Sequence, residues 1–214
     1  MDERLARTLR TYEDNAERYA ATNADRSGVD ALLDRFLDAL DGDHALDGDH
    51  ALDGDHALDG RRVLDVGCGP GWETARLAAA DVDVVGLDIS PSLLATATDR
   101  ADGADLALAD ARSIPFRSGT VDGAWACASL VHLPRDQLPG ALSELSRVLR
   151  TDGLFGATVK SEAYDDRTDD YDGERHFEYY EADAFEDHVE RAGFDVTAVE
   201  SSENGWLWVE ARAG

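Results

Sequence analysis

Lysine and cysteine are scarce in this sequence. Lys160 is the single lysine, and every other basic residue is an arginine. Two cysteines, Cys68 and Cys127, stand in 214 residues, which is too few for a disulfide framework, and their spacing is not that of metal ligands. The composition therefore argues against a small disulfide-stapled domain and against a cysteine-based metal site.

Long apolar runs are also missing, and none approaches the roughly 20 residues that cross a bilayer. The N-terminus, MDERLARTLRTYEDN, is charged from residue 2 and has no apolar stretch typical of a secretory signal. We therefore expect a cytoplasmic protein with no membrane partner.

Acidic residues dominate the charge. There are 46 of them against 20 basic residues, which gives a formal net charge of -26. Such a surface disfavours phosphate backbones and anionic membranes as partners. A salt-rich cytoplasm explains both the acid excess and the missing lysine, because a Debye length of roughly 3 Å screens the repulsion between carboxylates. The alternative is an acidic protein of an ordinary cell, and strong screening would weaken the argument against nucleic acid.

The first 60 residues divide into two parts. Residues 1–40 predict a helical cap, because Leu5, Leu9, Tyr12, Ala16 and Tyr19 recur at helical spacing. Residues 41–60 repeat DGDHAL three times. A period of six does not align the repeated histidines on a helix, and glycine and aspartate are poor strand formers. A histidine ladder for a metal is the alternative to the solvated linker that we expect, and we predict no metal site.

From residue 61 to 214 short apolar strands alternate with helices. The pattern predicts strands at 62–67, 82–88, 106–109, 121–130, 154–159, 194–200 and 206–211, and helices at 71–80, 90–100, 134–150 and 182–192. This alternation predicts an α/β fold, a Rossmann-like three-layer sandwich whose mostly parallel seven-stranded sheet ends in an antiparallel edge hairpin. Ligands of such sheets bind beyond the carboxyl ends of the strands.

A glycine-rich turn follows the first of these strands. It reads Asp65-Val66-Gly67-Cys68-Gly69-Pro70-Gly71, and its glycines allow a sharp turn and a close approach to a ligand. Trp72 stands where the dinucleotide fingerprint G-x-G-x-x-G requires its last glycine, and no lysine follows as in a P-loop. A nicotinamide-dependent oxidoreductase is therefore disfavoured.

The turn instead resembles motif I of the class I S-adenosylmethionine-dependent methyltransferases, an acidic residue followed by G-x-G-x-G. Further resemblances lie in register along residues 61–212, at Asp88, Asp110-Ala111, Ile114-Pro115-Phe116, Val121-Asp122, Ser129–Leu133 and Leu145–Gly153. Two departures, Thr151-Asp152-Gly153 for the usual Pro-Gly-Gly and Val121 for the usual Phe, fall where the family does not touch its ligand.

The resemblance implies S-adenosylmethionine as the cofactor and a role for several side chains. Asp88 would accept both ribose hydroxyls, Asp110 the adenine amino group, and Asp65 would pair with the α-ammonium group. Gly67 and Gly69 would admit the methionine part. The full set of implied cofactor-binding residues is Asp65, Gly67, Cys68, Gly69, Gly71, Asp88, Ile89, Asp110, Ala111, Ser129, Leu130, Tyr12 and Tyr19.

Three features concern the methyl acceptor. His132, just past the fourth strand, is the candidate general base, and the alternative is that it packs in the turn before Pro134. Tyr12 and Tyr19 match an N-terminal helix that covers the cofactor in related enzymes, or else an ordinary amphipathic helix. Arg175 and Tyr180 are candidates for acceptor binding, because the family inserts such elements after its fifth strand.

We therefore predict methyl transfer from S-adenosylmethionine to a small-molecule acceptor. The alternatives are methylation of RNA or protein with a partner subunit, and a catalytically silent scaffold that binds the cofactor. The sequence does not specify the acceptor, the accepting atom or the oligomeric state.

Overall fold

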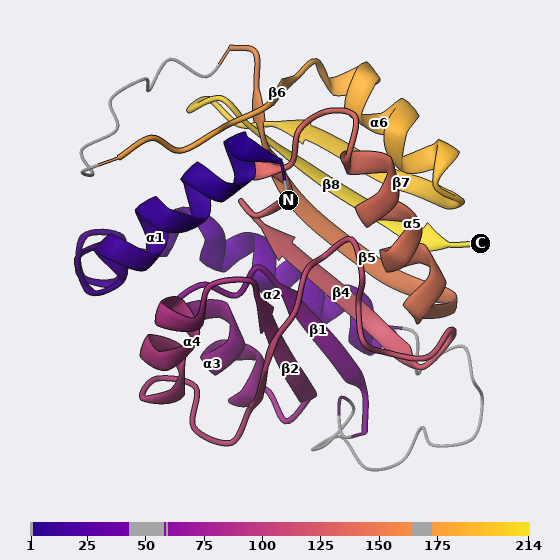
Figure 1. Cartoon of the computed structure of the whole chain (residues 1–214). Helices are drawn as coiled ribbons and strands as arrows, with labels where there is room; N and C mark the ends of the chain where they lie inside the picture. The colour runs from indigo at the N-terminus through magenta and orange to yellow at the C-terminus, as the bar shows by residue number, and fades with distance from the viewer. Residues whose placement is uncertain (1, 43–57, 59, 164–172) are drawn as a thin grey trace.

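One sheet organises the chain in the computed structural model, which describes residues 2–42, 58, 60–163 and 173–214 (Figure 1). Its strands run in the order β3-β2-β1-β4-β5-β8-β7, with β6 paired to β5. Their bounds are β1 Arg62–Val66, β2 Asp83–Asp88, β3 Asp105–Leu108, β4 Val121–Cys127, β5 Leu149–Ser161, β6 Tyr179–Tyr180, β7 Phe194–Ser201 and β8 Trp206–Ala213.

The pairing confirms the predicted fold class. Strands β3, β2, β1, β4 and β5 are mutually parallel, and β8 runs antiparallel to both β5 and β7. The eighth strand, β6, was not predicted. It consists of two residues beside Lys160 and Ser161 of β5, and a segment that short has no periodicity to read.

Helices cover both faces of the sheet and make the three layers. On one face α2 (Ser27–Gly42) and α3 (Trp72–Ala78) pack with the strands around Trp125 and Trp208. On the other, α5 (Leu138–Val148) and α6 (Ala182–Arg191) bury Leu142, Leu145 and Phe185. The remaining helices are α1 (Glu3–Thr22) and α4 (Pro91–Thr98), and the three-residue turn η2 (Leu130–His132) follows β4.

Aromatic rings fix α2 against the sheet. The Phe36 ring lies 5.3 Å from that of Trp125, which lies 5.3 Å from that of Trp208. Gly156 of β5 makes room for them, since a Cβ there would come within 2.6 Å of Trp208 and 2.9 Å of Phe36. Half of the segment predicted as a cap therefore belongs to the core of the sandwich. Most of the predicted repeat linker, residues 43–57 and 59, lies outside the described residues.

Several predicted boundaries move in the structure, among them the end of the strand predicted over 121–130, which stops at Cys127 before η2. The helix expected over 134–150 begins at Leu138, with Pro139 in its first turn, because η2 and a turn occupy the residues before it. The strand expected at 154 begins at Leu149 and includes the turn at Asp152, whose φ of 63° is left-handed. Turns of this kind produce no apolar periodicity in the sequence, so the pattern did not locate these boundaries.

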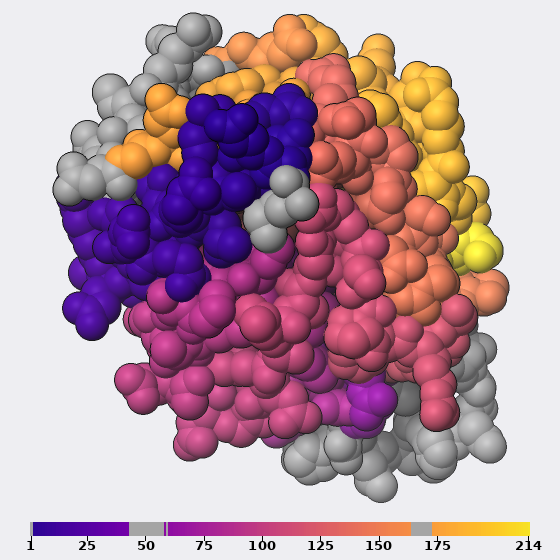
Figure 2. All heavy atoms as spheres, viewed as in Figure 1, coloured from indigo at the N-terminus to yellow at the C-terminus, as the bar shows by residue number. Residues whose placement is uncertain are grey.

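Helix α1 lies across the end of the sheet toward which the arrow of β4 points (Figure 1). Its first turn is capped by Asp2, whose carboxylate accepts the N–H of Arg4 at 2.8 Å. In the space-filling view α1 fills the notch between the segments after β1 and the C-terminal part of the chain (Figure 2). None of the helices among the described residues combines the length and apolar character that a membrane span requires.

We expect Phe36→Ala to lower the free energy of unfolding by about 3–5 kcal/mol, because it leaves a cavity beneath α2. Denaturant titration in concentrated KCl would measure the change. Asp38→Ala, on the exposed side of the same helix, is the control and should change little. Equal stability of the two variants would mean that α2 does not support the sheet.

Candidate active site

The turn between β1 and α3 holds three glycines in left-handed conformations. Their φ angles are 74° at Gly67, 54° at Gly69 and 83° at Gly71. A Cβ at Gly67 would lie 2.2 Å from the Cβ of Ser129, so the turn touches the exit of β4. A Cβ at Gly71 would lie 2.9 Å from that of Ala97, so the third glycine lets α4 approach. A side chain at Gly67 or Gly71 would clash with these neighbours, whereas at Gly69 only the left-handed backbone favours glycine.

Asp88 closes β2 and joins two neighbouring segments. Its Oδ2 accepts the N–H of Gly69 and its Oδ1 accepts the N–H of Ser90, both at 2.8 Å. The side chain is almost fully buried, and burial raises the pKa of Asp88 although these two N–H groups oppose the change. The carboxylate thus ties the glycine turn to the start of α4.

Asp110 follows β3 and forms an ion pair with Arg112. The Arg112 Nη2 lies 2.5 Å from Oδ2, and its backbone N–H donates to Oδ1 at 2.9 Å. The guanidinium holds the pKa of Asp110 below its usual value, so the carboxylate is ionised.

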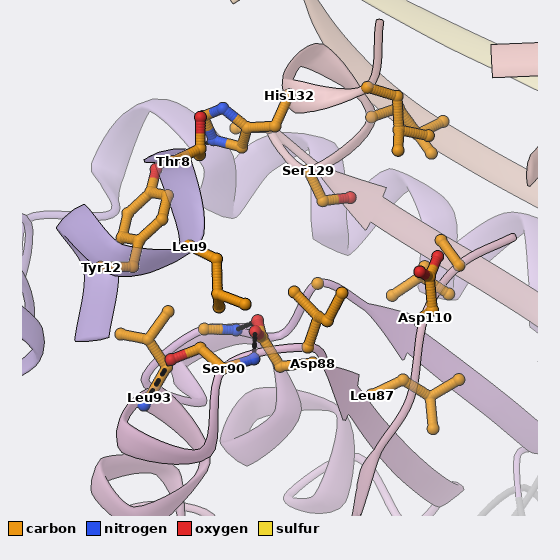
Figure 3. Close-up of a pocket in the computed structure, with 18 of the residues that line it drawn as sticks. Thr8, Leu9, Tyr12, Leu87, Asp88, Ser90, Leu93, Asp110, Ser129 and His132 are labelled. Atoms are coloured by element: carbon orange, nitrogen blue, oxygen red, sulfur yellow. Dashed lines mark hydrogen bonds between the residues drawn. The ribbon is translucent and has the colours of Figure 1, made fainter. Parts of the chain in front are cut away.

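These segments converge on one cavity (Figure 3). It encloses about 890 Å³ of space when the solvent at its mouth is included. Helix α1 covers it with Leu5, Thr8, Leu9, Tyr12 and Tyr19. The predicted site residues that line it are Gly67, Gly69, Asp88, Ile89, Asp110, Ala111, Ser129, Leu130, Tyr12, Tyr19 and His132.

Three predicted cofactor-binding residues do not line this cavity. Asp65 is 2% exposed and lies 2.5 Å from the hydroxyl of Thr74, where burial and the nearby Glu73 raise its pKa to about 8. A neutral, buried Asp65 does not support the predicted pairing with an ammonium group. Cys68 is buried and burial raises the pKa of its thiol, which agrees with a loop filler and not with a nucleophile. The third is Gly71, whose missing side chain lets α4 pack closely against the start of α3.

The two residues predicted to bind the acceptor have different surroundings. Tyr180 is 0% exposed and packs against Phe185 of α6, with Arg135 over its ring, so it does not reach the cavity. Tyr180 was predicted as an acceptor-binding residue only because it follows the fifth strand. In the structure it belongs to β6, which places its side chain in the core. Arg175 is not among the residues that line the cavity, but its Nη1 donates to the hydroxyl of Tyr12, which does, at 3.2 Å.

His132 meets Tyr12 at the upper end of the cavity. Their Nε2 and Oη atoms are 2.9 Å apart, and the other ring nitrogen, Nδ1, lies 2.7 Å from the backbone carbonyl of His176. The ring also packs against that of Phe177 at 4.8 Å. Burial lowers the pKa of His132 to about 4, so the ring is neutral at neutral pH. His132 therefore packs in a turn and also lines the cavity, and its role as a general base stays a prediction.

A family model described as a methyltransferase domain matches residues 63–153. Residues 63–153 are therefore similar to a methyltransferase domain. Within this stretch lie the segments after β1, β2, β3 and β4 that line the cavity. The match confirms the resemblance to the class I S-adenosylmethionine-dependent methyltransferases that the motifs indicated.

Curated relatives match the same part of the chain. One is Methyltransferase GfsG of Streptomyces halstedii, 39% identical over 98 residues, which are 42% of this chain and 34% of the relative. Another is 27-O-demethylrifamycin SV methyltransferase of Amycolatopsis mediterranei, 39% identical over 97 residues, 42% of this chain and 35% of the relative. The match thus spans about a third of these relatives' length.

Solved structures share the fold of the methyltransferase domain over more of the chain. A DhpI complex with SAH has a TM-score of 0.72 at 20% identity and covers 99% of this chain and 97% of its own. The [4+2]-cyclase SpnF has a TM-score of 0.65 at 23% identity, covering 86% of this chain and 80% of its own. Since a cyclase shares the architecture, the fold by itself does not define the reaction.

Sequence reasoning missed several residues that build the cavity. Glu13 of α1 accepts hydrogen bonds from the hydroxyls of Ser90 and Ser92, the latter at 2.7 Å, and so ties α1 to α4. Ala128 lines the cavity with a φ of 52°, which is unusual for a residue with a side chain. No local pattern marks Glu13 or Ala128, whereas Ser90 is a favoured N-cap residue and its Oγ accepts the N–H of Leu93 at 3.1 Å.

Metal ligands are not grouped anywhere in the part of the chain that the structure describes, where no three histidine, cysteine, aspartate or glutamate side chains are placed to hold an ion. His44, His50 and His56 of the repeat lie outside the described residues. The absence of a metal site therefore stays a prediction.

The raised pKa of Asp65 predicts a pH dependence of stability. Between about pH 4, where an unfolded aspartate ionises, and pH 8, the folded protein holds a proton that the unfolded chain has lost. Stability from this group therefore falls as the pH rises. We expect Asp65→Asn to gain stability relative to wild type from pH 4.5 to pH 8, measured by denaturant titration. Asp99→Asn, an exposed change, should show no such trend, and a pH-independent difference for Asp65→Asn would contradict the assignment.

Proposed function

We propose that this domain binds S-adenosylmethionine in the cavity and transfers its methyl group to a small-molecule acceptor. The observation that supports this most directly is the convergence of Gly67–Gly69, Asp88 and Asp110 on one hollow. These segments are far apart in the sequence and follow three different strands, as a nucleoside-binding site of this topology requires.

The acidic side chains suit a ribose and an adenine. Each oxygen of Asp88 accepts one backbone N–H, and a carboxylate oxygen can accept a second hydrogen bond, here from a ribose hydroxyl. Asp110, kept ionised by Arg112, would accept the adenine amino group, with Ile89 and Ala111 beside it.

The remaining lining suits the methionine part. Gly67 and Gly69 offer backbone without side chains, and Cys68 would contribute only its backbone. The Ser129 hydroxyl is buried and has no hydrogen-bond partner among the described residues, which is costly unless a ligand supplies one. Figure 3 shows it at the hollow between His132 and Asp110. When bound, the cofactor supplies a methyl group on a cationic sulfur, and the chain orients the acceptor toward it.

A small acceptor is supported by the relatives and by α1. The names of two similar proteins specify small molecules, a rifamycin in Amycolatopsis mediterranei and, for a solved structure from Burkholderia thailandensis, 1,6-didemethyltoxoflavin. In this chain Tyr12 and Tyr19 of α1 cover the cavity, which leaves little room for a macromolecule. His132 is the candidate base, and Arg175 would contribute through Tyr12.

We also propose that the protein works in a cytoplasm rich in salt, because its net charge is -26 and it has one lysine. Dilution from about 2 M to 0.1 M KCl lengthens the Debye length from under 3 Å to about 10 Å and restores the repulsion between carboxylates. Circular dichroism should then show loss of the folded state. Equal stability at both salt concentrations would favour an acidic protein of an ordinary cell.

Calorimetry in concentrated KCl tests the cofactor. S-adenosylhomocysteine should bind, and NAD should not. Binding of NAD alone would overturn the proposal, and binding of S-adenosylhomocysteine without turnover of any acceptor would favour the silent scaffold.

Asp88→Asn should weaken S-adenosylhomocysteine binding by about 1–3 kcal/mol, because an amide cannot accept the same set of hydrogen bonds from ribose and backbone. The same titration measures it. Asp99→Asn, at the exposed residue that follows α4, is the control and should bind as wild type. An unchanged affinity of the Asp88 variant would place the ribose elsewhere.

A further inference from the structure

Three groups form a hydrogen-bonded series whose direction can be assigned. The His176 carbonyl can only accept, so the Nδ1 of His132, 2.7 Å away, carries a hydrogen. A neutral imidazole carries one hydrogen, and Nε2 is therefore an acceptor. The atom 2.9 Å from Nε2 is the Tyr12 hydroxyl, which must donate to it. The Tyr12 hydrogen thus points at His132 and not into the cavity.

The Tyr12 oxygen therefore presents lone pairs to its other neighbours. Arg175 Nη1 donates to it from 3.2 Å, and a phenol oxygen can accept two hydrogen bonds. Tyr12 and His132 both line the cavity, and Figure 3 shows the Tyr12 hydroxyl directed toward the His132 ring. A group that binds to this oxygen from the cavity must itself bring a hydrogen.

We propose that Tyr12 is a catalytic proton relay that takes the proton of an acidic acceptor hydroxyl, a phenol or an enol, and hands its own proton to His132. The inference rests on the proposed function. It makes His132 the final proton holder and Tyr12 the residue that touches the acceptor.

Two protons and one methyl group move in this step. The acceptor O–H proton moves to the Tyr12 oxygen while the Tyr12 proton moves to Nε2 of His132. The acceptor oxygen uses the freed electron pair to form its bond to the methyl carbon, as the carbon–sulfur bond breaks and its electron pair stays on a neutral thioether. The imidazolium then returns one proton to water through Tyr12.

The charges around His132 restrict which hydroxyl can react. Arg175 and His176 approach from the segment after β5, Lys160 from β5 itself, and Glu178 contacts His176 at 3.1 Å. Burial and the cations Arg175 and Lys160 disfavour an imidazolium, which is why the pKa of His132 falls to about 4. The same cations favour an oxyanion. A base this weak serves a phenol or an enol and not an aliphatic alcohol, whose proton is far harder to remove.

Helix α1 assembles the relay. Thr8 accepts the N–H of His176 at 2.7 Å, and the Thr11 hydroxyl donates to the Glu174 carbonyl at 3.0 Å. The carbonyl that sets the tautomer and the hydroxyl that carries the proton are therefore fixed by the same helix.

Nitrogen NMR of the whole protein tests the direction of the series without an acceptor. The His132 signals, assigned by their loss in His132→Gln, should be those of a neutral ring protonated at Nδ1 at pH 7, and should titrate near pH 4. Tyr12→Phe should shift the Nε2 signal. A ring protonated at Nε2, or a cationic ring at pH 7, would overturn the relay.

Kinetics with S-adenosylmethionine and a panel of substituted phenols and β-diketone enols tests the step. Tyr12→Phe and His132→Gln should each lower kcat by at least about 100-fold, since a positioned proton acceptor contributes 10²–10⁴-fold. The double variant should lose no more than either single one. The fall in kcat below pH 5 should disappear in His132→Gln, while S-adenosylhomocysteine binding changes less than about threefold.

Tyr180→Phe is the matched control, because it removes a buried phenol hydroxyl that has no partner among the described residues and lies away from the cavity. It should keep full kcat. Retained kcat in Tyr12→Phe, or multiplied losses in the double variant, would overturn the relay. Wild type that binds S-adenosylhomocysteine but turns over none of the panel would overturn the acceptor class and leave the proposed function standing, whereas no binding would refute both.

Discussion

The buried carboxylate of Asp88 is the interaction on which the cavity depends. It accepts one backbone N–H from the glycine turn after β1 and one from the start of α4, both at 2.8 Å. Two segments that would otherwise move independently are thereby held at a fixed separation. Because burial of an unpaired carboxylate is costly, these two bonds are also what keep Asp88 stable in its place.

Helix α1 extends the same framework to the other side of the cavity. Glu13 binds the hydroxyls of Ser90 and Ser92, next to Asp88, and Thr8 and Thr11 hold the segment after β5. The helix therefore bridges the start of α4 and the segment after β5. In this arrangement Tyr12 meets His132, which is the contact on which the proposed proton relay depends.

The acidic composition does not extend evenly into the site. Arg112 pairs with Asp110, and the charges of Arg175 and Lys160 act on His132, so cations lie near the cavity within a chain of net charge -26. These are the charges that the proposed relay would use to favour an oxyanion.

The sequence by itself determined the order of strands and helices, the glycine turn and the acids at the strand ends. Those features are local, because apolar periodicity and left-handed glycines reflect neighbouring residues. The strand-end position of Asp88 and Asp110 was enough to bring them to one edge, since parallel strands end together. Tertiary structure alone decided that Asp65 faces Thr74 and that Tyr180 turns into the core. It also decided that Phe36 of α2 packs on Trp125 and that Tyr12 meets His132. Such contacts join residues up to 120 positions apart, as for Tyr12 and His132, and depend on how the crossovers pack and not on any pattern along the chain.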